Sequence, residues 1–448
     1  MLKDAWKLAI ETLGIVELQK LSERLALARV SRQLGIDDAS TIRFAYGLVV
    51  ETVRRKNLIA EFIHSVVRPK KLSDFRLDVS AFLQLYVYQT RVAKNWEKID
   101  FAEATRIAGL ARTILGWQTL RGAERYLGFL LTRPVGPLLA EANDEQRVAL
   151  CTFQPAWFVK YCFNLLGRHE ALKFLESSIY PPPVCIRFNT LKASYEEILK
   201  KLEAEGVQLS KIEPLRDAHS LVHTDSPLKN LSSFRNGLFF VQDKASCYAV
   251  EIANPTPGLT VLDVCAAPGA KTTYIAQLMQ NRGKIYSLDY SVRRLKSWKQ
   301  EVNRMGVNIA ESVVADARCS FPLDIGADLV VLDPPCTSTG VFGRQPSAKW
   351  RLTSKSIESM AAVQWQMISN VSERVKQGGV LVYCTCSVTV EENERILERF
   401  LKRHPDFHLA DLAPKLGMPG LRGLIQCRRL FPHLHDSNGF FIAKLVKL

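Results

Sequence analysis

The chain lacks the two glycine-rich signatures of the common nucleotide-binding loops. Neither G-x-G-x-x-G nor G-x-x-x-x-G-K-[ST] occurs in its 448 residues. These loops hold the pyrophosphate of a dinucleotide and the phosphates of a nucleoside triphosphate, respectively. We therefore do not expect either ligand. No internal repeat or low-complexity segment is visible, so repeat architectures are also excluded.

Long apolar runs and cysteine pairs of the zinc type are also absent. No apolar run approaches the roughly 20 residues that a membrane span needs. The N-terminus carries Asp4 and Glu11 in an amphipathic pattern, unlike a signal peptide. The ten cysteines include no C-x-x-C pair. We therefore expect reduced thiols, a cytoplasmic location, no membrane association and no metal site.

Positive charge is plentiful. The chain has 60 Lys and Arg against 45 Asp and Glu, a formal net charge of +15. The excess is spread along the chain and is not confined to a basic tail. Such a surface suits a polyanion such as nucleic acid. A basic composition alone also occurs in proteins without a nucleic-acid partner.

One stretch, Val261–Thr273, combines a buried strand, a loop of small residues and the start of a helix. Small side chains in the loop allow a ligand to approach the backbone, and the first turn of the helix offers unpaired N–H groups. A second strand pattern ends at Asp289, twenty residues after Gly269. An acidic side chain at this position meets ribose hydroxyls in nucleotide-binding α/β folds. We therefore expect a ligand with an adenosyl group and no phosphates, and S-adenosylmethionine is the common ligand of this kind.

The alternation of strands and helices predicts an α/β fold with a Rossmann-like, doubly wound and mostly parallel sheet. The expected parallel strands cover residues 260–264, 284–288, 309–314, 329–332 and 379–383. A last strand, antiparallel to these, is expected at 439–445. Helical periodicity dominates residues 1–142, and residues 143–232 read as linker helices followed by a small α/β subdomain. The catalytic domain is expected over residues 233–448.

Three motifs then carry a family resemblance. They are CAAPGAKT at 265–272, DPPCTSTG at 333–340 and TCS at 385–387. In this order they resemble the RNA cytosine-5 methyltransferase family, the Sun/Fmu group. Ala270 stands where the family more often has a second glycine. The segments 43–49 and 86–89 resemble a NusB-like RNA-binding domain, and the small α/β subdomain is similar to the family's RRM-like extension.

The resemblance implies a role for each motif residue. Cys386 is the expected nucleophile, Cys336 the residue that aids product release, and Asp333 the contact to ring nitrogen N3, the exocyclic amine and the cofactor's methionine end. Asp289 is expected to hold the ribose and Asp316 the adenine edge. The residues expected to wrap the methionine moiety are Cys265, Ala266, Ala267, Pro268, Gly269, Ala270 and Lys271.

The expected substrate is RNA, small-subunit ribosomal RNA in preference to transfer RNA, acted on by a monomer. Three other readings stay open. An amino-group methyltransferase typically has an aromatic residue after Asp-Pro-Pro, where Cys336 stands here. A non-catalytic RNA-binding or assembly factor could keep the fold without the reaction. The two cysteines could also have reversed roles, because DNA cytosine-5 methyltransferases use the proline-preceded cysteine.

The loop at 340–351 interleaves basic and aromatic residues, among them Arg344, Lys349 and Trp350. Cations in such a loop can meet phosphates, and a flat ring can stack on an exposed base. The alternative is a loop in which Trp350 is docked against the protein.

Overall fold

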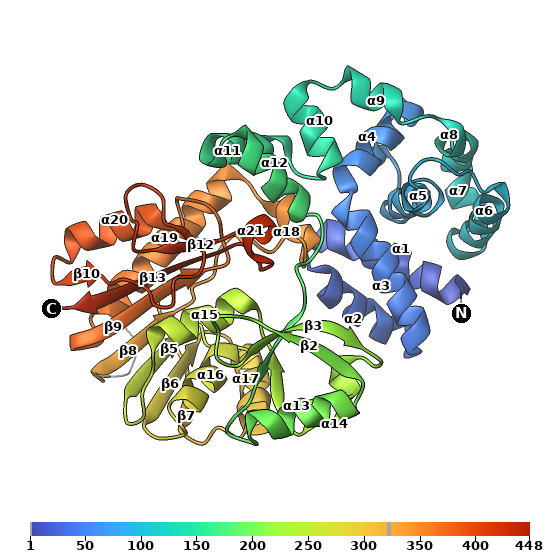
Figure 1. Ribbon diagram of the computed structural model, residues 1–448. Helices are drawn as coiled ribbons and strands as arrows, with labels where there is room; N and C mark the ends of the chain where they lie inside the picture. The colour runs from blue at the N-terminus through green and yellow to red at the C-terminus, as the bar shows by residue number, and fades with distance from the viewer. Residues whose placement is uncertain (1, 320–323) are drawn as a thin grey trace. The chain divides into compact units, whose positions relative to one another are not determined.

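A computed structural model describes residues 2–319 and 324–448 (Figure 1). The chain forms two compact units. The first contains the residues up to Tyr180 together with Phe342–Arg351, and the second contains Pro181–Val341 and Leu352–Leu448. Among the described residues, no helix combines the length and the apolar composition that a membrane span requires. The domain boundaries expected at residues 142 and 232 stay predictions.

The first unit is helical, as expected. Its central helix is α5 (Leu77–Thr90), which buries side chains all round its circumference, as a helix at the centre of a core must. α1, α3, α4 and α6 pack on it. The helices are α1 (Leu2–Gln19), α2 (Glu23–Leu34), α3 (Ala39–Arg54), α4 (Lys56–Val67), α6 (Phe101–Leu115), α7 (Trp117–Glu124), α8 (Leu127–Thr132), α9 (Gly136–Glu141), α10 (Asp144–Cys151), α11 (Ala156–Leu166) and α12 (Arg168–Ser177).

A short helix from much later in the chain, α18 (Pro346–Arg351), also belongs to this unit and lies beside α3 (Figure 1). The indole N–H of Trp350 donates to the carbonyl of Val53 at 2.6 Å, and the Ser347 N–H donates to the Glu23 carboxylate at 2.7 Å. Lys349 is only 1% exposed. The expectation that this loop's cations meet phosphates is therefore wrong for Lys349, and the docked alternative describes Trp350.

The second unit begins with a four-stranded antiparallel sheet in the order β2-β3-β1-β4. Its elements are β1 (Cys185–Phe188), α13 (Tyr195–Ala204), β2 (Val207–Lys211), β3 (Ala218–Thr224), α14 (Ser232–Arg235) and β4 (Phe239–Val241). A capping box begins α13, where Ser194 accepts from the Glu197 N–H and Glu197 accepts from the Ser194 N–H. This subdomain confirms the small α/β unit that the sequence indicated.

A larger sheet forms the rest of the second unit, with the path β11-β12-β13-β9-β8-β5-β6-β7 and β10 paired to β13. The strands β5 to β9 run parallel, and β13 is antiparallel to β9. The strands are β5 (Thr260–Val264), β6 (Lys284–Asp289), β7 (Ala310–Val314), β8 (Ala327–Leu332), β9 (Val375–Thr385), β10 (Phe407–Leu409), β11 (Met418–Pro419), β12 (Arg428–Leu430) and β13 (Phe440–Lys447). The Rossmann-like architecture and the antiparallel last strand are confirmed.

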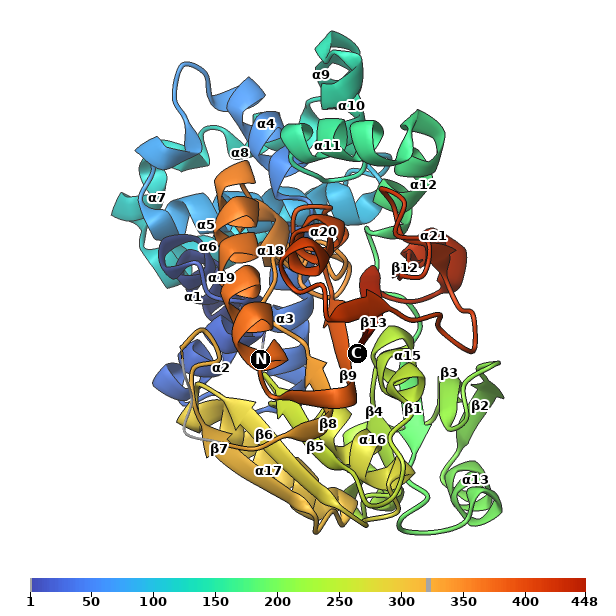
Figure 2. The same cartoon turned by 90° about the vertical axis from the view of Figure 1, so that its left-hand side faces the viewer.

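Helices cover both faces of this sheet, in separate layers in Figure 2. Each face of the sheet has its own apolar core, and alternate residues of a strand contribute to opposite cores. Val261 and Val331 pack with α15 to α17, whereas Leu262 and Leu332 pack with α19 and α20. Side chains alternate between the faces of a strand, so near-continuous apolar strands are the signature of a sheet covered twice. The helices are α15 (Lys244–Ala253), α16 (Ala270–Leu278), α17 (Val292–Met305), α19 (Ser354–Ser372), α20 (Glu394–Arg403) and α21 (Pro432–His435).

The register of the central strands aligns the carboxyl ends of β5, β6 and β8. Val264 in β5 pairs with Leu288 in β6 and with Leu332 in β8. The residues that follow these three (Cys265, Asp289 and Asp333) therefore leave the sheet side by side at one edge. In parallel α/β sheets, ligands bind outside this carboxyl edge, where the strand order reverses.

Two glycines join the loop after β8 to the chain entering β13. The Gly439 N–H donates to the Gly340 carbonyl at 2.8 Å, and the Gly340 N–H donates to the Cys386 carbonyl at 2.9 Å. A Cβ atom on Gly340 would lie 2.0 Å from the Gly439 carbonyl oxygen. Backbone blocks this position, so the two segments approach this closely only because residue 340 has no side chain.

We predict that Gly340→Ala lowers the melting temperature and slows the methyl transfer that the family resemblance implies, because the added methyl group must push the loop that carries Cys336 away from β13. Calorimetry and a methylation assay on the same preparation measure both effects. Gly109→Ala is the matched control, since nothing lies within 4 Å of a Cβ atom at that helical position. The control should stabilise the protein by roughly 0.5–1 kcal/mol. A Gly340→Ala protein with unchanged melting temperature and activity would contradict the prediction.

Candidate active site

The loop between β5 and α16 is tightly turned, and its small side chains allow a ligand to approach the backbone closely. Gly269, which precedes α16, has a φ of 108°, and Cys265 has a φ of 62°, which is uncommon for a residue with a side chain. The Gly269 N–H donates to the Ala266 carbonyl at 2.8 Å and closes the loop. Burial raises the pKa of the Cys265 thiol to about 12, so this cysteine stays protonated. The glycine missing at Ala270 is not needed for the turn, since Ala270 is already the first residue of the helix.

Asp289 lies at the end of β6 and is 2% exposed. Its carboxylate accepts from the Ala267 N–H at 3.3 Å and from the Ser291 N–H at 3.0 Å, and it is 3.1 Å from the Arg294 guanidinium. It therefore ties its own strand end to the loop after β5. Asp316 follows β7, and a hydrogen bond from Arg318 lowers the pKa of its carboxyl. The carboxylates thus follow successive strands of the sheet, as the sequence predicted.

Asp263, the penultimate residue of β5, is a buried carboxyl with an incomplete set of partners. Thr272 donates to one of its oxygens at 2.5 Å, and the other, Oδ1, has no hydrogen-bond partner among the described residues. Burial raises the pKa of this carboxyl to about 7. A buried acceptor without a donor fits a ligand that brings N–H groups, such as the ammonium of a methionine moiety. The residues present therefore fit S-adenosylmethionine.

Lys271 and Asp333 form an ion pair between the start of α16 and the end of β8, with 2.5 Å between Nζ and Oδ2. Burial opposes the charged form of Lys271, but the charge of Asp333 and the hydrogen bond to it outweigh burial and raise its pKa. Lys271 thus stays a cation. Its pairing with Asp333 was missed in the sequence, where Lys271 was assigned only to the cofactor loop, because pairing across two strands leaves no local pattern.

The two predicted thiols meet. Cys336 follows β8 and Cys386 follows β9, and their sulfurs are 3.0 Å apart. The hydrogen bond to Cys386 and burial together raise the pKa of Cys336 well above the usual thiol range. The Cys336 thiol is therefore protonated at neutral pH. Cys384, two residues before Cys386, is fully buried in the core, as expected for a structural cysteine.

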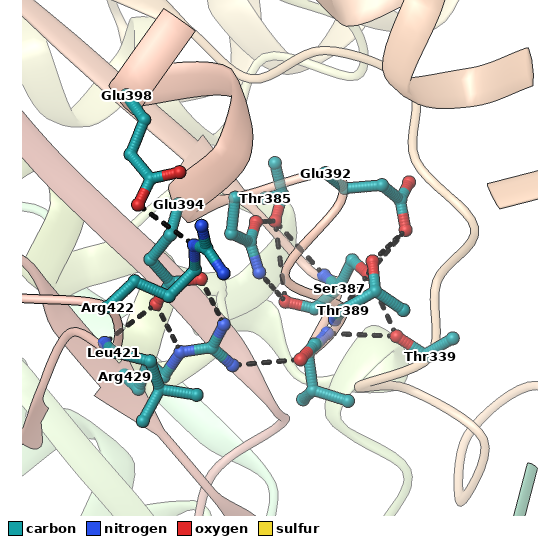
Figure 3. Close-up of polar contacts among 12 residues, drawn as sticks. Thr339, Thr385, Ser387, Thr389, Glu392, Glu394, Glu398, Leu421, Arg422 and Arg429 are labelled. Carbon is teal, nitrogen blue, oxygen red and sulfur yellow. Dashed lines mark hydrogen bonds and ion pairs between the residues drawn. The ribbon is translucent and has the colours of Figure 1, made fainter. Parts of the chain in front are cut away.

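Three consecutive polar residues beside the thiols were not singled out from the sequence. Glu392, Asn393 and Glu394 are all 0% exposed, and Figure 3 shows Glu392 and Glu394 engaged with different partners. The signal that could have found them is the run itself. Three adjacent polar side chains at the start of a helix point in different directions, so some of them can face the protein, and those that are buried need partners.

The helical unit contains a hollow of about 380 Å³, lined among others by Asn57, Glu61 and Gln154. Its lining offers no thiol, and its charged groups are the carboxylates of Glu61 and Glu141. The reaction that the resemblance implies needs a nucleophilic thiol, which the loops after β8 and β9 carry. We therefore place the candidate active site at the carboxyl edge of the large sheet.

Comparison with known proteins agrees with this fold. The family model "16S rRNA methyltransferase RsmB/F" matches residues 250–446, and the model for the RsmF/B-like ferredoxin-like domain matches residues 154–224. The ribosomal RNA small subunit methyltransferase B of Serratia proteamaculans is 33% identical over 84% of this chain and 82% of its own. The probable ribosomal RNA small subunit methyltransferase B of Bacillus subtilis is 29% identical over 98% of both chains.

Two solved structures extend the comparison. The crystal structure of PH0851 has a TM-score of 0.84 and 30% identity, covering 99% of each chain. NSun6 from Pyrococcus horikoshii, solved with SFG, has a TM-score of 0.61 and 27% identity, covering 65% of this chain and 98% of its own. The fold and site therefore define a Rossmann-like methyltransferase. More particularly, the chain belongs to the RNA cytosine-5 methyltransferase family.

The buried carboxyl of Asp263 predicts a pH-dependent stability. Its pKa of about 7 in the folded protein lies above the unfolded value near 4, so its contribution is most favourable below about pH 4 and is lost as the pH rises to about 7. Asp263→Asn keeps the bond from Thr272 and removes the ionisation. We expect the melting temperature of the cofactor-free variant, relative to that of the parent, to rise between pH 4 and pH 7.

Calorimetry of the parent and the variant at matched pH values measures this difference. All other titrating groups are common to both proteins and cancel. A difference between the two melting temperatures that stays constant from pH 4 to pH 8 would show that Asp263 does not titrate as described.

Proposed function

We propose that this enzyme transfers a methyl group from S-adenosylmethionine to C5 of a cytosine in RNA, through a covalent bond from Cys386 to ring carbon C6. The observation that carries the proposal is the thiol pair, with 3.0 Å between its sulfurs, at the sheet edge that also presents Asp333. A thiol, a carboxylate and a cation at one edge of the sheet suit chemistry on a pyrimidine.

The chemistry explains why a thiol is needed. C5 of cytosine is too weak a nucleophile to take a methyl group unaided. When the Cys386 thiolate adds to C6, the ring becomes an enamine and its electron pair reaches C5. Charge develops at N3 in the same step, and a positioned donor stabilises it. In the Asp333–Lys271 pair, the carboxylate would accept from the exocyclic amine and the Lys271 cation would stabilise the negative charge that develops at N3.

The raised pKa of Cys336 supports its assignment as the second thiol. After C5 has been methylated, a base must remove the C5 proton, and the electron pair left behind restores the C5–C6 double bond and expels the Cys386 sulfur. The departing sulfur leaves as a thiolate. The S–H group of Cys336 can donate a hydrogen bond to this thiolate and make it a better leaving group.

The cofactor is assigned to the loop after β5 and its neighbours. When bound, S-adenosylmethionine supplies an electrophilic methyl group. The loop from Cys265 to Lys271 would hold the methionine moiety, together with the free oxygen of Asp263 and the Asp333 carboxylate. Asp289 would hold the ribose and Asp316 the adenine edge. The SFG bound to the NSun6 neighbour is an S-adenosylmethionine analogue, which supports this cofactor.

We assign the RNA as small-subunit ribosomal RNA, which the names of the Serratia proteamaculans and Bacillus subtilis relatives support. The residues up to 142 are proposed as a NusB-like RNA-binding domain of a monomeric enzyme. This domain carries two basic clusters, at residues 54–56 and 68–71. In the second cluster, Arg68, Lys70 and Lys71 are exposed. Arg54, in contrast, is 4% exposed and donates to the Gly343 carbonyl at 3.0 Å. The exposed cluster is the one that can meet phosphates.

We predict that replacing Cys386 and replacing Cys336 block different steps of the reaction. Cys386→Ala removes the nucleophile, so neither methylated RNA nor a covalent adduct should form. Cys336→Ala still permits addition and methyl transfer but slows elimination, so a protein–RNA adduct should accumulate. Denaturing gel electrophoresis of each variant with substrate RNA detects the adduct, because only a covalent complex survives it.

An adduct with Cys386→Ala and none with Cys336→Ala would reverse the two roles. Full methylation by both variants would show that the reaction does not pass through a cysteine adduct at all.

The RNA target can be tested with S-adenosylmethionine as the only methyl donor. We expect the purified enzyme to methylate a cytosine in small-subunit ribosomal RNA, read by bisulfite sequencing, and the Cys386→Ala protein to leave it unmodified. Methylation of transfer RNA instead would correct the target while keeping the reaction. RNA binding by the intact parent chain without methylation of either RNA would favour the non-catalytic assembly factor.

A further inference from the structure

Glu392 is a buried carboxylate that collects five hydrogen bonds. It is 0% exposed and accepts from the Thr337 N–H at 2.8 Å and from the Thr337 hydroxyl. The hydroxyls of Ser387 and Thr389 donate to it at 2.6 and 2.8 Å, and the Gln364 amide donates at 2.9 Å. Figure 3 shows Glu392 directed at Ser387 and Thr389. All five contacts place donors on its two side-chain oxygens, which suits a carboxylate as the acceptor.

The donors are not scattered over the fold. Thr337 directly follows Cys336, and Ser387 directly follows Cys386. One carboxylate thus bonds to the neighbour of each thiol, although the two thiols follow different strands. The Gln364 amide, which also donates to Glu392, donates to the Pro335 carbonyl at 2.9 Å. The loop around Cys336 is therefore held on both sides of its sulfur.

Asn393, the residue after Glu392, holds the backbone on both sides of Cys386. Asn393 accepts from the Thr385 hydroxyl at 2.6 Å and donates to the Ser387 carbonyl at 2.9 Å. Thr385 and Ser387 flank Cys386, so this amide fixes the backbone on both sides of the nucleophile. Such satisfied buried networks rigidify the groups that they connect.

We propose that Glu392 is a positioning residue that sets the separation of the Cys336 and Cys386 sulfurs by binding both of their loops. This inference rests on the proposed function. Glu392 does not touch the reacting atoms. It acts through Thr337 and Ser387, and its effect should therefore appear in the chemical step and not in the binding of either substrate.

The charge of Glu392 also affects the protonation of Cys336. The charge of Glu392 is one of the causes that raise the pKa of Cys336, after the hydrogen bond to Cys386, burial and the charge of Cys386. The same carboxylate thus holds the two sulfurs together and helps to keep the proton on Cys336. Loss of the charge should affect both properties at once.

The test compares two glutamates that are equally buried and two residues apart. Glu392→Gln keeps the size of the side chain but places an amide N–H₂ among the donors. We expect kcat to fall by about 10- to 100-fold, the scale of a misplacement of about 1 Å. The KM values for S-adenosylmethionine and RNA should be little changed. Thr337→Val removes a single donor and should lower kcat in the same direction but less.

Glu394→Gln is the matched control. Glu394 pairs with Arg429 and accepts from the Leu421 N–H at 3.0 Å, on the other side of the network (Figure 3). Its own carboxylate bonds to neither cysteine loop, and its partner Arg429 donates to the Val388 carbonyl at 2.8 Å. Breaking this buried ion pair should lower the melting temperature clearly and leave kcat of the folded protein near the parent value. If Glu394→Gln lowers kcat as much as Glu392→Gln does, Glu392 has only a structural role.

A second readout does not depend on activity. Mass spectrometry gives the alkylation rate of each cysteine by iodoacetamide at pH 8 in the parent, Glu392→Gln and Glu394→Gln proteins. We expect Glu392→Gln to speed alkylation of Cys336, because the charge of Glu392 is one of the causes that raise the pKa of this thiol. Unchanged alkylation and unchanged kcat in Glu392→Gln would overturn the inference. A parent chain that methylates no RNA would overturn the proposed function, and the alkylation rates would still decide the role of Glu392.

Discussion

The register of the parallel strands β5, β6 and β8 is the constraint on which the site depends. Because Val264, Leu288 and Leu332 are paired, the residues after them leave the sheet at one level. Cys336 and Cys386 then follow from the adjacent strands β8 and β9. A slip of one residue in any of these strands would turn its buried side chains to the opposite face and disperse the site. The apolar cores on both faces of the sheet therefore fix the chemistry as well as the fold.

A close pair of thiols also needs polar support, and the buried network around Glu392 provides it. Desolvating a carboxylate is costly unless donors surround it. Here five donors do so, and they come from the segments after β8 and β9 and from α19. The Gly340–Gly439 contact adds a steric limit to the same loop. The arrangement favours one geometry of the two sulfurs and makes alternatives unfavourable.

The sequence was sufficient for features with local patterns. Apolar runs predicted the central strands, and the three motifs predicted Cys336, Cys386 and Asp333 at their ends. β9 was expected to begin at residue 379 but begins at Val375, since Gly378 and Gly379 interrupt its apolar pattern. Partnerships between distant segments could not be predicted. The pairing of Lys271 with Asp333 and the inclusion of α18 in the helical unit depend on tertiary packing, which no local spacing encodes.

The central claim is that Cys386, supported by Cys336, bonds to the base. RNA that contains 5-fluorocytidine tests it most directly, since fluorine at C5 blocks the elimination and traps the adduct. Digestion of the trapped complex and mass spectrometry then identify the cysteine that carries the nucleotide. The account predicts the nucleotide on Cys386 in the otherwise unaltered chain. A nucleotide found on Cys336 would contradict it.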